Sequence, residues 1–215
     1  MPEVNTERGS VLSVIHKPKN CLLLVAFPLT EEEFLNDLRP ESPKDYAKMT
    51  ASKFKFLPHF LWMHNHLPLV KTIKDCAGTV SPLGVTVKLQ ATPSDLNDIS
   101  GYSVVTLVAH FNNKQQEVEF SDKLYSIDEV AGMADENFRG VFDLSVCNSK
   151  FLQDKLKDKY GDRCFVKANI DLAEIKIHLI LYKNVIEMLS KFETNYLTAM
   201  LNLKRQLNSY ANNKM

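Results

Sequence analysis

Two side chains that could form a cysteine nucleophile and its partner base follow two apolar runs of the chain. The first run, Val104–Ala109, stops at His110, and the second, Val141–Val146, stops at Cys147. A thiolate attacks carbonyl carbon atoms, and a neighbouring imidazole stabilises the thiolate or supplies a proton. The two residue types therefore indicate nucleophilic chemistry, provided that the fold brings them together.

Both runs have the composition of buried strands in a parallel sheet, because they are rich in β-branched and aliphatic residues. Parallel neighbours lie about 5 Å apart. His110 and Cys147 are then expected side by side at the carboxyl edge of the sheet, where open α/β sheets bind their ligands.

The link between the two strands predicts a crossover. It holds a short extended piece, Glu117–Phe120, and then a capping box formed by Ser126 and Glu129. This box predicts a helix over about Ile127–Met133. A second helix is expected directly after Cys147, capped by Asn148 or Ser149. A thiol at a helix N-terminus has its thiolate form stabilised.

An apolar strand that ends in His, followed by one that ends in Cys-x-Ser, resembles the caspase-like cysteine proteases and more closely their bacterial CHAT branch. Leu124–Val130 looks like the segment that leads into the cysteine strand, and Phe142–Ser149 looks like the nucleophile motif. The resemblance extends from near Tyr102 to the C-terminus. It implies a cysteine endopeptidase with a peptide or protein substrate and no cofactor, acting in bacterial regulated proteolysis under a regulatory partner.

The resemblance also assigns roles. Cys147 would attack the scissile carbonyl, and His110 would protonate the leaving amine or assist thiolate formation. The backbone N–H groups of Phe111 and Cys147 would hold the oxyanion. The family usually has glycine after the histidine, in a loop, whereas this chain has Phe111, which does not freely take positive φ. This departure favours an alternative, a catalytically inactive CHAT-like interaction module.

A third interpretation is a generic doubly wound α/β binding protein, whose ligand pocket would not include Cys147. The substrate-binding residues are not identified by the sequence. Asp122 and Asp162 are candidates for selecting a basic residue next to the cleaved bond.

The rest of the chain predicts one α/β domain over residues 1–215, with a doubly wound, mostly parallel sheet flanked by helices. Further strands are expected at Leu22–Phe27, Val85–Ala91 and Cys164–Ala168. Residues 1–19 form an N-terminal extension. Two C-terminal helices are expected at about 172–191 and 195–209, either packed on the domain or forming a partner-binding coiled coil.

Composition excludes several classes of function. Lysine plus arginine and aspartate plus glutamate both number 26, so nothing indicates nucleic acid or an anionic membrane. No apolar run approaches the roughly 20 residues that span a bilayer. The polar N-terminus does not resemble a signal peptide, so a cytoplasmic location is expected.

The remaining cysteines and histidines indicate structural roles. Cys21, Cys76 and Cys164 are far apart and form no CxxC pair, so we expect buried thiols and neither disulfides nor a zinc site. The aromatic-rich segment from Phe54 to Leu67 contains three histidines, His59, His64 and His66. They could bind a metal, but their spacing matches no common site. We expect an amphipathic segment over one face of the sheet, with the histidines at its rim.

Overall fold

The computed structural model describes residues 14–41, 57–112, 116–146, 149–168 and 175–212. Within them the strands form one mixed sheet, whose parallel part has the order β2-β1-β3-β6-β7. These strands are β1 (Cys21–Ala26), β2 (Thr86–Leu89), β3 (Val104–Asn112), β6 (Gly140–Val146) and β7 (Cys164–Ala168). An antiparallel hairpin of β4 (Glu117–Glu119) and β5 (Leu124–Ser126) pairs with the end of β3.

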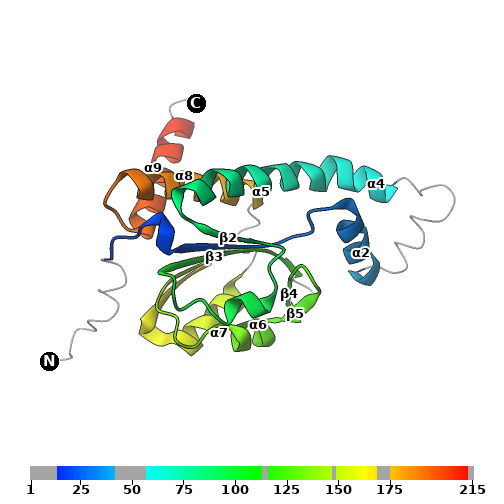
Figure 1. Ribbon diagram of the computed structural model, residues 1–215, viewed down its shortest axis with the longest axis horizontal. Coiled ribbons are helices and arrows are strands. Elements are labelled where there is room, and N and C mark those ends of the chain that lie inside the picture. The colour runs from blue at the N-terminus through cyan, green and yellow to red at the C-terminus, as the bar shows by residue number, and fades with distance from the viewer. Residues whose placement is uncertain (1–13, 42–56, 113–115, 147–148, 169–174, 213–215) are drawn as a thin grey trace.

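Helices cover both faces of the sheet, as Figure 1 shows. One face carries α5 (Leu67–Val80), α8 (Ile175–Lys191) and α9 (Tyr196–Asn212), and the other carries α6 (Ile127–Met133) and α7 (Lys150–Tyr160). The predicted α/β class, a mostly parallel sheet flanked by helices, is confirmed.

The remaining helices are short or lie at the ends of strands. Helix α2 (Glu31–Glu41) follows β1, and α4 (Leu57–Leu61) continues through the π-helical turn η2 (Trp62–His66) into α5. Short 3-10 turns are η1 (Pro18–Asn20), η3 (Ser81–Leu83), η4 (Pro93–Leu96) and η5 (Gly161–Arg163).

Strand β3 lies at the centre of the parallel part, and its side chains alternate between two cores. Val105, Leu107 and Ala109 pack on the α6 and α7 side, whereas Val104 and Val108 pack on the α5, α8 and α9 side. All five are buried. This explains why the run is apolar apart from Thr106, which is also buried, and does not alternate with polar residues.

Glycine is required where β6 begins. Gly140 has φ +149°, and a Cβ built there would lie 2.3 Å from the carbonyl oxygen of Ser103. The next residue, Val141, donates its N–H to that same oxygen at 3.0 Å. Gly140 therefore lets β6 start in tight register beside β3.

Most predicted boundaries in the second half of the chain are confirmed. Helix α6 spans Ile127–Met133, and its capping box is formed: the Glu129 N–H donates to the Ser126 hydroxyl at 3.2 Å, and the Ser126 N–H donates to the Glu129 carboxylate at 2.8 Å. Strand β7 also has the predicted bounds.

Two predictions near His110 need correction. The strand does not stop at His110 but continues to Asn112, because β4 pairs with its last three residues. The extended piece predicted at Glu117–Phe120 is the first strand of a hairpin, and its partner β5 was not predicted. Strands as short as β4 and β5 give little periodicity to read.

The two C-terminal helices pack on the domain. Leu179, Ile186 and Met200 belong to the core on that face of the sheet. The chain turns between α8 and α9, where the N–H of Thr198 donates to the Asn195 side chain at 2.8 Å. This packing agrees with the first of the two predicted alternatives. Residues 1–13 of the predicted N-terminal extension lie outside the described residues.

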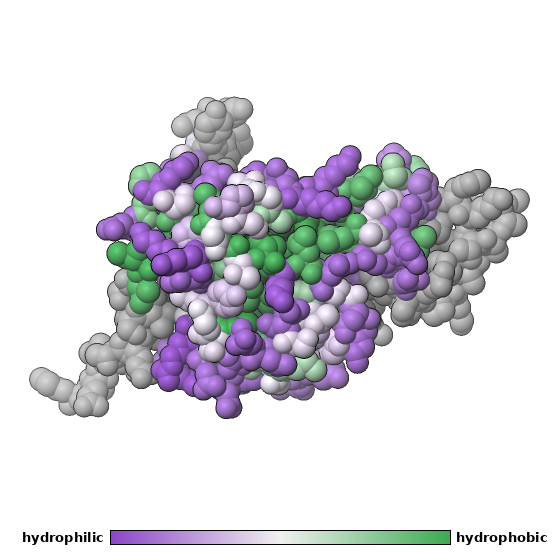
Figure 2. Space-filling view, viewed as in Figure 1, coloured by the Kyte–Doolittle hydropathy of each residue, from purple (hydrophilic) through white to green (hydrophobic). Residues whose placement is uncertain are grey.

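Apolar side chains also gather on the outside, in the middle of the face shown in Figure 2, over the β2 edge of the sheet. Leu83, which precedes this strand, and Leu89, its last residue, are 36% and 37% exposed. Hydrophilic side chains border the apolar band on both sides (Figure 2). In the part of the chain that the structure describes, no helix combines the length and apolar character needed to cross a bilayer.

Candidate functional site

The two strands that carry the predicted dyad are parallel neighbours. Their register pairs Ala109 with Val146, the residues directly before His110 and Cys147. His110 is exposed at the carboxyl edge of the sheet. Cys147 lies outside the described residues, so the predicted adjacency of the strands is confirmed, whereas contact between the imidazole and the thiol stays a prediction.

The β4–β5 hairpin lies on the β1–β2 side of β3. Its turn residue Ser121 donates its hydroxyl to the carbonyls of Gln90 and Ala91, which follow β2, at 2.6 and 2.9 Å. The other side of β3, toward β6, keeps an unbroken parallel ladder up to Ala109 and Val146. The hairpin therefore does not separate the ends of β3 and β6.

Glu119 is a candidate residue that the sequence analysis missed. It is the antiparallel partner of His110 across β3 and β4. Directly opposed residues in such a pair have side chains on one face of the sheet, with Cβ atoms about 5 Å apart. A carboxylate at that distance can orient an imidazole. The available signal was the alternation Glu117-Val118-Glu119, which is typical of a strand with one buried face.

Phe111 does not sit in a loop. It is a strand residue paired with Val118, and its side chain is 4% exposed in the core beside Phe120. Its backbone N–H therefore lies in the plane of the sheet, as in any strand. The loop expected directly after His110 is wrong, because hairpin pairing and burial of the Phe111 ring extend β3.

The other three cysteines are poor nucleophiles. Cys21, Cys76 and Cys164 are buried and free. Burial raises the pKa of each of these thiols to about 12. They stay protonated near neutral pH, which agrees with the structural role expected for them. Among the four cysteines of the chain, Cys147 is thus the one left as a candidate nucleophile.

A helix does begin directly after the Cys147 segment, as predicted. Ser149 is its N-cap residue and α7 starts at Lys150. The N–H of Gln153 donates to the Ser149 carbonyl at 2.8 Å. The N-terminus of a helix carries partial positive charge, which favours an anion such as a thiolate close to it.

The three histidines of the aromatic segment have separate partners. The Nδ1 atom of His59 lies 2.6 Å from the Glu31 carboxylate, and the ring of His64 lies 4.2 Å from that of Phe60. Nε2 of His66 donates to the Pro28 carbonyl at 2.7 Å. Among the described residues, no group of histidine, cysteine or carboxylate side chains is arranged to hold a metal ion.

His66 belongs to an aromatic cluster behind the carboxyl end of β1. Its ring centroid lies 4.7 Å from that of Phe34 and 5.1 Å from that of Trp62. Burial lowers the pKa of His66. From Leu57 onward the segment therefore packs as an aromatic layer, in which His59 and His66 make hydrogen bonds and His64 lies against the Phe60 ring.

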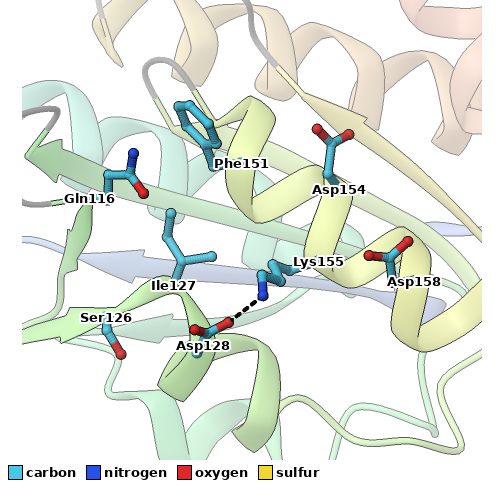
Figure 3. A pocket seen from close by; sticks show the side chains of 8 residues that line it. All are labelled: Gln116, Ser126, Ile127, Asp128, Phe151, Asp154, Lys155 and Asp158. Carbon is cyan, nitrogen blue, oxygen red and sulfur yellow. Dashed lines mark ion pairs between the residues drawn. The ribbon is translucent and has the colours of Figure 1, made fainter.

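A groove of about 310 Å³ runs between α6 and α7. It is lined by Gln116, Ser126, Ile127, Asp128, Phe151, Asp154, Lys155 and Asp158. Figure 3 shows the Lys155 side chain reaching from α7 to Asp128 on α6, and the two charged groups lie 2.8 Å apart. Phe151 and Gln116 lie toward one end of the groove and Asp158 toward the other (Figure 3).

The two aspartates considered for substrate selection lie elsewhere. Asp162 is in η5, at the amino end of β7 and so at the opposite edge of the sheet from His110. Asp122 lies in the hairpin turn and accepts a hydrogen bond from the hydroxyl of Tyr125. The position of Asp162 excludes it from a site at the carboxyl edge.

A buried charge cluster lies on the face of the sheet that α8 and α9 cover. Asp143 is fully buried, and Lys167 on the adjacent strand places its ammonium group 2.6 Å from the carboxylate. The hydroxyl of Tyr196, at the start of α9, donates to the other carboxylate oxygen at 2.8 Å. Because solvent does not reach Asp143, this cluster is not a candidate site. It connects β6, β7 and α9.

Comparison of the chain with protein-family models, with curated proteins and with solved structures gives no match.

Proposed function

We propose that the protein is a cysteine endopeptidase of caspase-like type, in which His110 and Cys147 act as a dyad. The register that pairs Ala109 with Val146 carries this proposal. Because these two residues directly precede His110 and Cys147, the register supports a meeting of the two side chains at the carboxyl edge of the sheet, as the resemblance to the CHAT branch requires.

The chemistry follows from the two side chains. The Cys147 thiolate attacks the scissile carbonyl carbon and forms a C–S bond. The C–N bond then breaks, and His110 donates a proton to the departing amine. A water molecule next attacks the thioester, with His110 accepting its proton, and releases the acid product and the free thiol.

Two neighbouring features support this chemistry. The N-terminus of α7 favours negative charge on the thiolate. Glu119 stands across from His110 in the hairpin and would orient the imidazole, as a third group does in nucleophile–base pairs. Phe111 and Cys147 remain the backbone N–H groups proposed to hold the oxyanion.

Cleavage of a peptide library by the purified protein tests the proposal. Wild type should cleave a subset of peptides, and Cys147→Ala or a thiol-blocking reagent should lower the rate by about a thousandfold or more, because the nucleophile is lost. The matched control is Cys164→Ala, which removes a buried thiol and should leave cleavage close to wild type. Cleavage that survives in Cys147→Ala would rule out the dyad.

A second candidate function is an interaction module without catalysis. The burial of Phe111 within β3, at the position where the CHAT branch that the chain resembles usually has glycine, favours it. The apolar band over the β2 edge (Figure 2) also gives such a module a surface for a partner. Under this alternative, neither wild type nor Cys147→Ala cleaves any peptide.

A further inference from the structure

The groove between α6 and α7 has mixed chemistry. Ile127 gives it an apolar, 6% exposed floor, and the Phe151 ring is 55% exposed at one end. Its charged lining residues are three aspartates and one lysine. Lys155 pairs with Asp128, so Asp154 and Asp158 leave the groove with net negative charge.

Some residues that line the groove are also close in sequence to the proposed dyad. Helix α7, which supplies Phe151 and Asp154, begins three residues after Cys147. Gln116, at the same end as Phe151, directly precedes β4, the strand that pairs with the His110 end of β3. Because α7 starts at the carboxyl edge of the sheet, the Phe151 end of the groove lies nearer to that edge than the Asp158 end does.

From this geometry we infer that the α6–α7 groove binds a basic, partly apolar segment of the protein substrate. This inference rests on the proposed function, because the bound segment is a substrate only if the protein is an endopeptidase. The apolar part of such a segment packs on Phe151 and Ile127, and its lysine or arginine side chains approach Asp154 and Asp158. Opposite charges across a rim of this kind supply specificity and faster association.

A binding assay with inactive protein tests this docking site separately from hydrolysis. Cys147→Ala protein is titrated with three fluorescent peptides of equal length, in which leucine alternates with lysine, with glutamate or with serine. We expect the lysine peptide to bind best. Binding should weaken between 50 mM and 500 mM salt, because salt screens exposed charges.

Charge reversal identifies the groove as the site. Asp154→Lys/Asp158→Lys should weaken binding of the lysine peptide roughly tenfold, since each exposed ion pair contributes a factor of about two to five. The matched control is Glu32→Lys/Glu193→Lys, which changes the net charge equally at exposed acids on other elements. Phe151→Ser should weaken binding of the lysine peptide and of the serine peptide alike.

The outcomes separate the two proposals. Equal losses in the two double variants, or no preference for the lysine peptide, would overturn the docking site. If wild type and the Asp154→Lys/Asp158→Lys variant cleave basic peptides at the same rate, the docking site is also overturned. The proposed hydrolysis would then still stand. Groove-dependent binding without any cleavage by wild type would support the docking site and defeat the proposed hydrolysis alone.

Discussion

Asp143 is a fully buried carboxylate in the strand that leads to Cys147. Both of its oxygens are bound, one by the Lys167 ammonium and one by the Tyr196 hydroxyl. A buried charge is tolerated when its partners replace the water that it has lost. The three side chains therefore act together, and removal of one leaves the others in an unfavourable environment.

Asp143→Asn should lower the free energy of unfolding by about 3 kcal/mol, because it leaves Lys167 without its counter-ion in a site that is largely shielded from water. Tyr196→Phe should cost about 1.5–3 kcal/mol, the value of one hydrogen bond to a charged group. Urea denaturation measures both changes.

Asp128→Asn is the matched control, since it breaks an ion pair of similar length between side chains that are 54% and 76% exposed. It should cost less than about 1 kcal/mol. Equal losses for Asp143→Asn and Asp128→Asn would contradict the buried link.

At the scale of single elements, β6 depends on the glycine at its start. A side chain at Gly140 would meet the Ser103 carbonyl and would require positive φ. Gly140→Ala should therefore destabilise the fold by roughly 2 kcal/mol or more, through strain and displacement of β6.

Gly132→Ala in α6 is the control, because a Cβ there meets nothing within 4 Å. In a helix this change should stabilise by up to about 1 kcal/mol. Thermal melts of the two variants compare them directly, and similar shifts would contradict the role of Gly140 in starting β6.

The elements differ in how far their sequences determine them. Helix α6 was predicted to the residue, because Ser126 and Glu129 form a local capping box that needs no distant contact. The end of β3 was placed too early, because its extension depends on pairing with β4, which only the folded chain brings close. The same pairing sets Glu119 opposite His110.

Site residues differ in the same way. His110 was found from a strand that ends in a polar side chain, and β3 and β6 proved to be the neighbours that the crossover predicted. The groove between α6 and α7 could not be predicted, since its lining residues come from two helices and the segment before β4. Their mutual arrangement depends on how the helices pack on the sheet.

At the scale of the whole molecule, the N-terminal and C-terminal parts of the described chain meet at the junction of α8 and α9. His16 is 2% exposed there, and its Nδ1 accepts a hydrogen bond from the N–H of Tyr196 at 3.0 Å. The N–H of His16 donates to the Thr194 carbonyl at 3.1 Å. This contact fixes the start of α9 and with it the Tyr196 side chain on Asp143.

The junction makes stability depend on pH. Burial lowers the pKa of His16 below its ordinary value of 6.5. The unfolded chain therefore binds a proton from about pH 6.5 downward before the folded protein does, so stability is complete above that pH and falls on acidification. His66 and His178 add to this trend, since burial lowers their pKa as well.

Melting temperatures between pH 7.5 and 5.5 measure the effect. His16→Asn, which keeps an acceptor for the Tyr196 N–H, should show a smaller fall than wild type. His64→Asn changes an exposed histidine and should match wild type. An unchanged fall in His16→Asn would show that His16 does not contribute to the pH dependence.

The central claim is that the ends of β3 and β6 bring an imidazole and a reactive thiol together. The most direct measurement is the rate at which iodoacetamide alkylates Cys147 near pH 6.5, followed by mass spectrometry of the intact folded protein. We predict rapid alkylation of Cys147 ahead of the buried Cys21, Cys76 and Cys164, and a rate at least about tenfold lower in His110→Ala. Alkylation of Cys147 no faster than in the unfolded chain, with no change in His110→Ala, would contradict the claim.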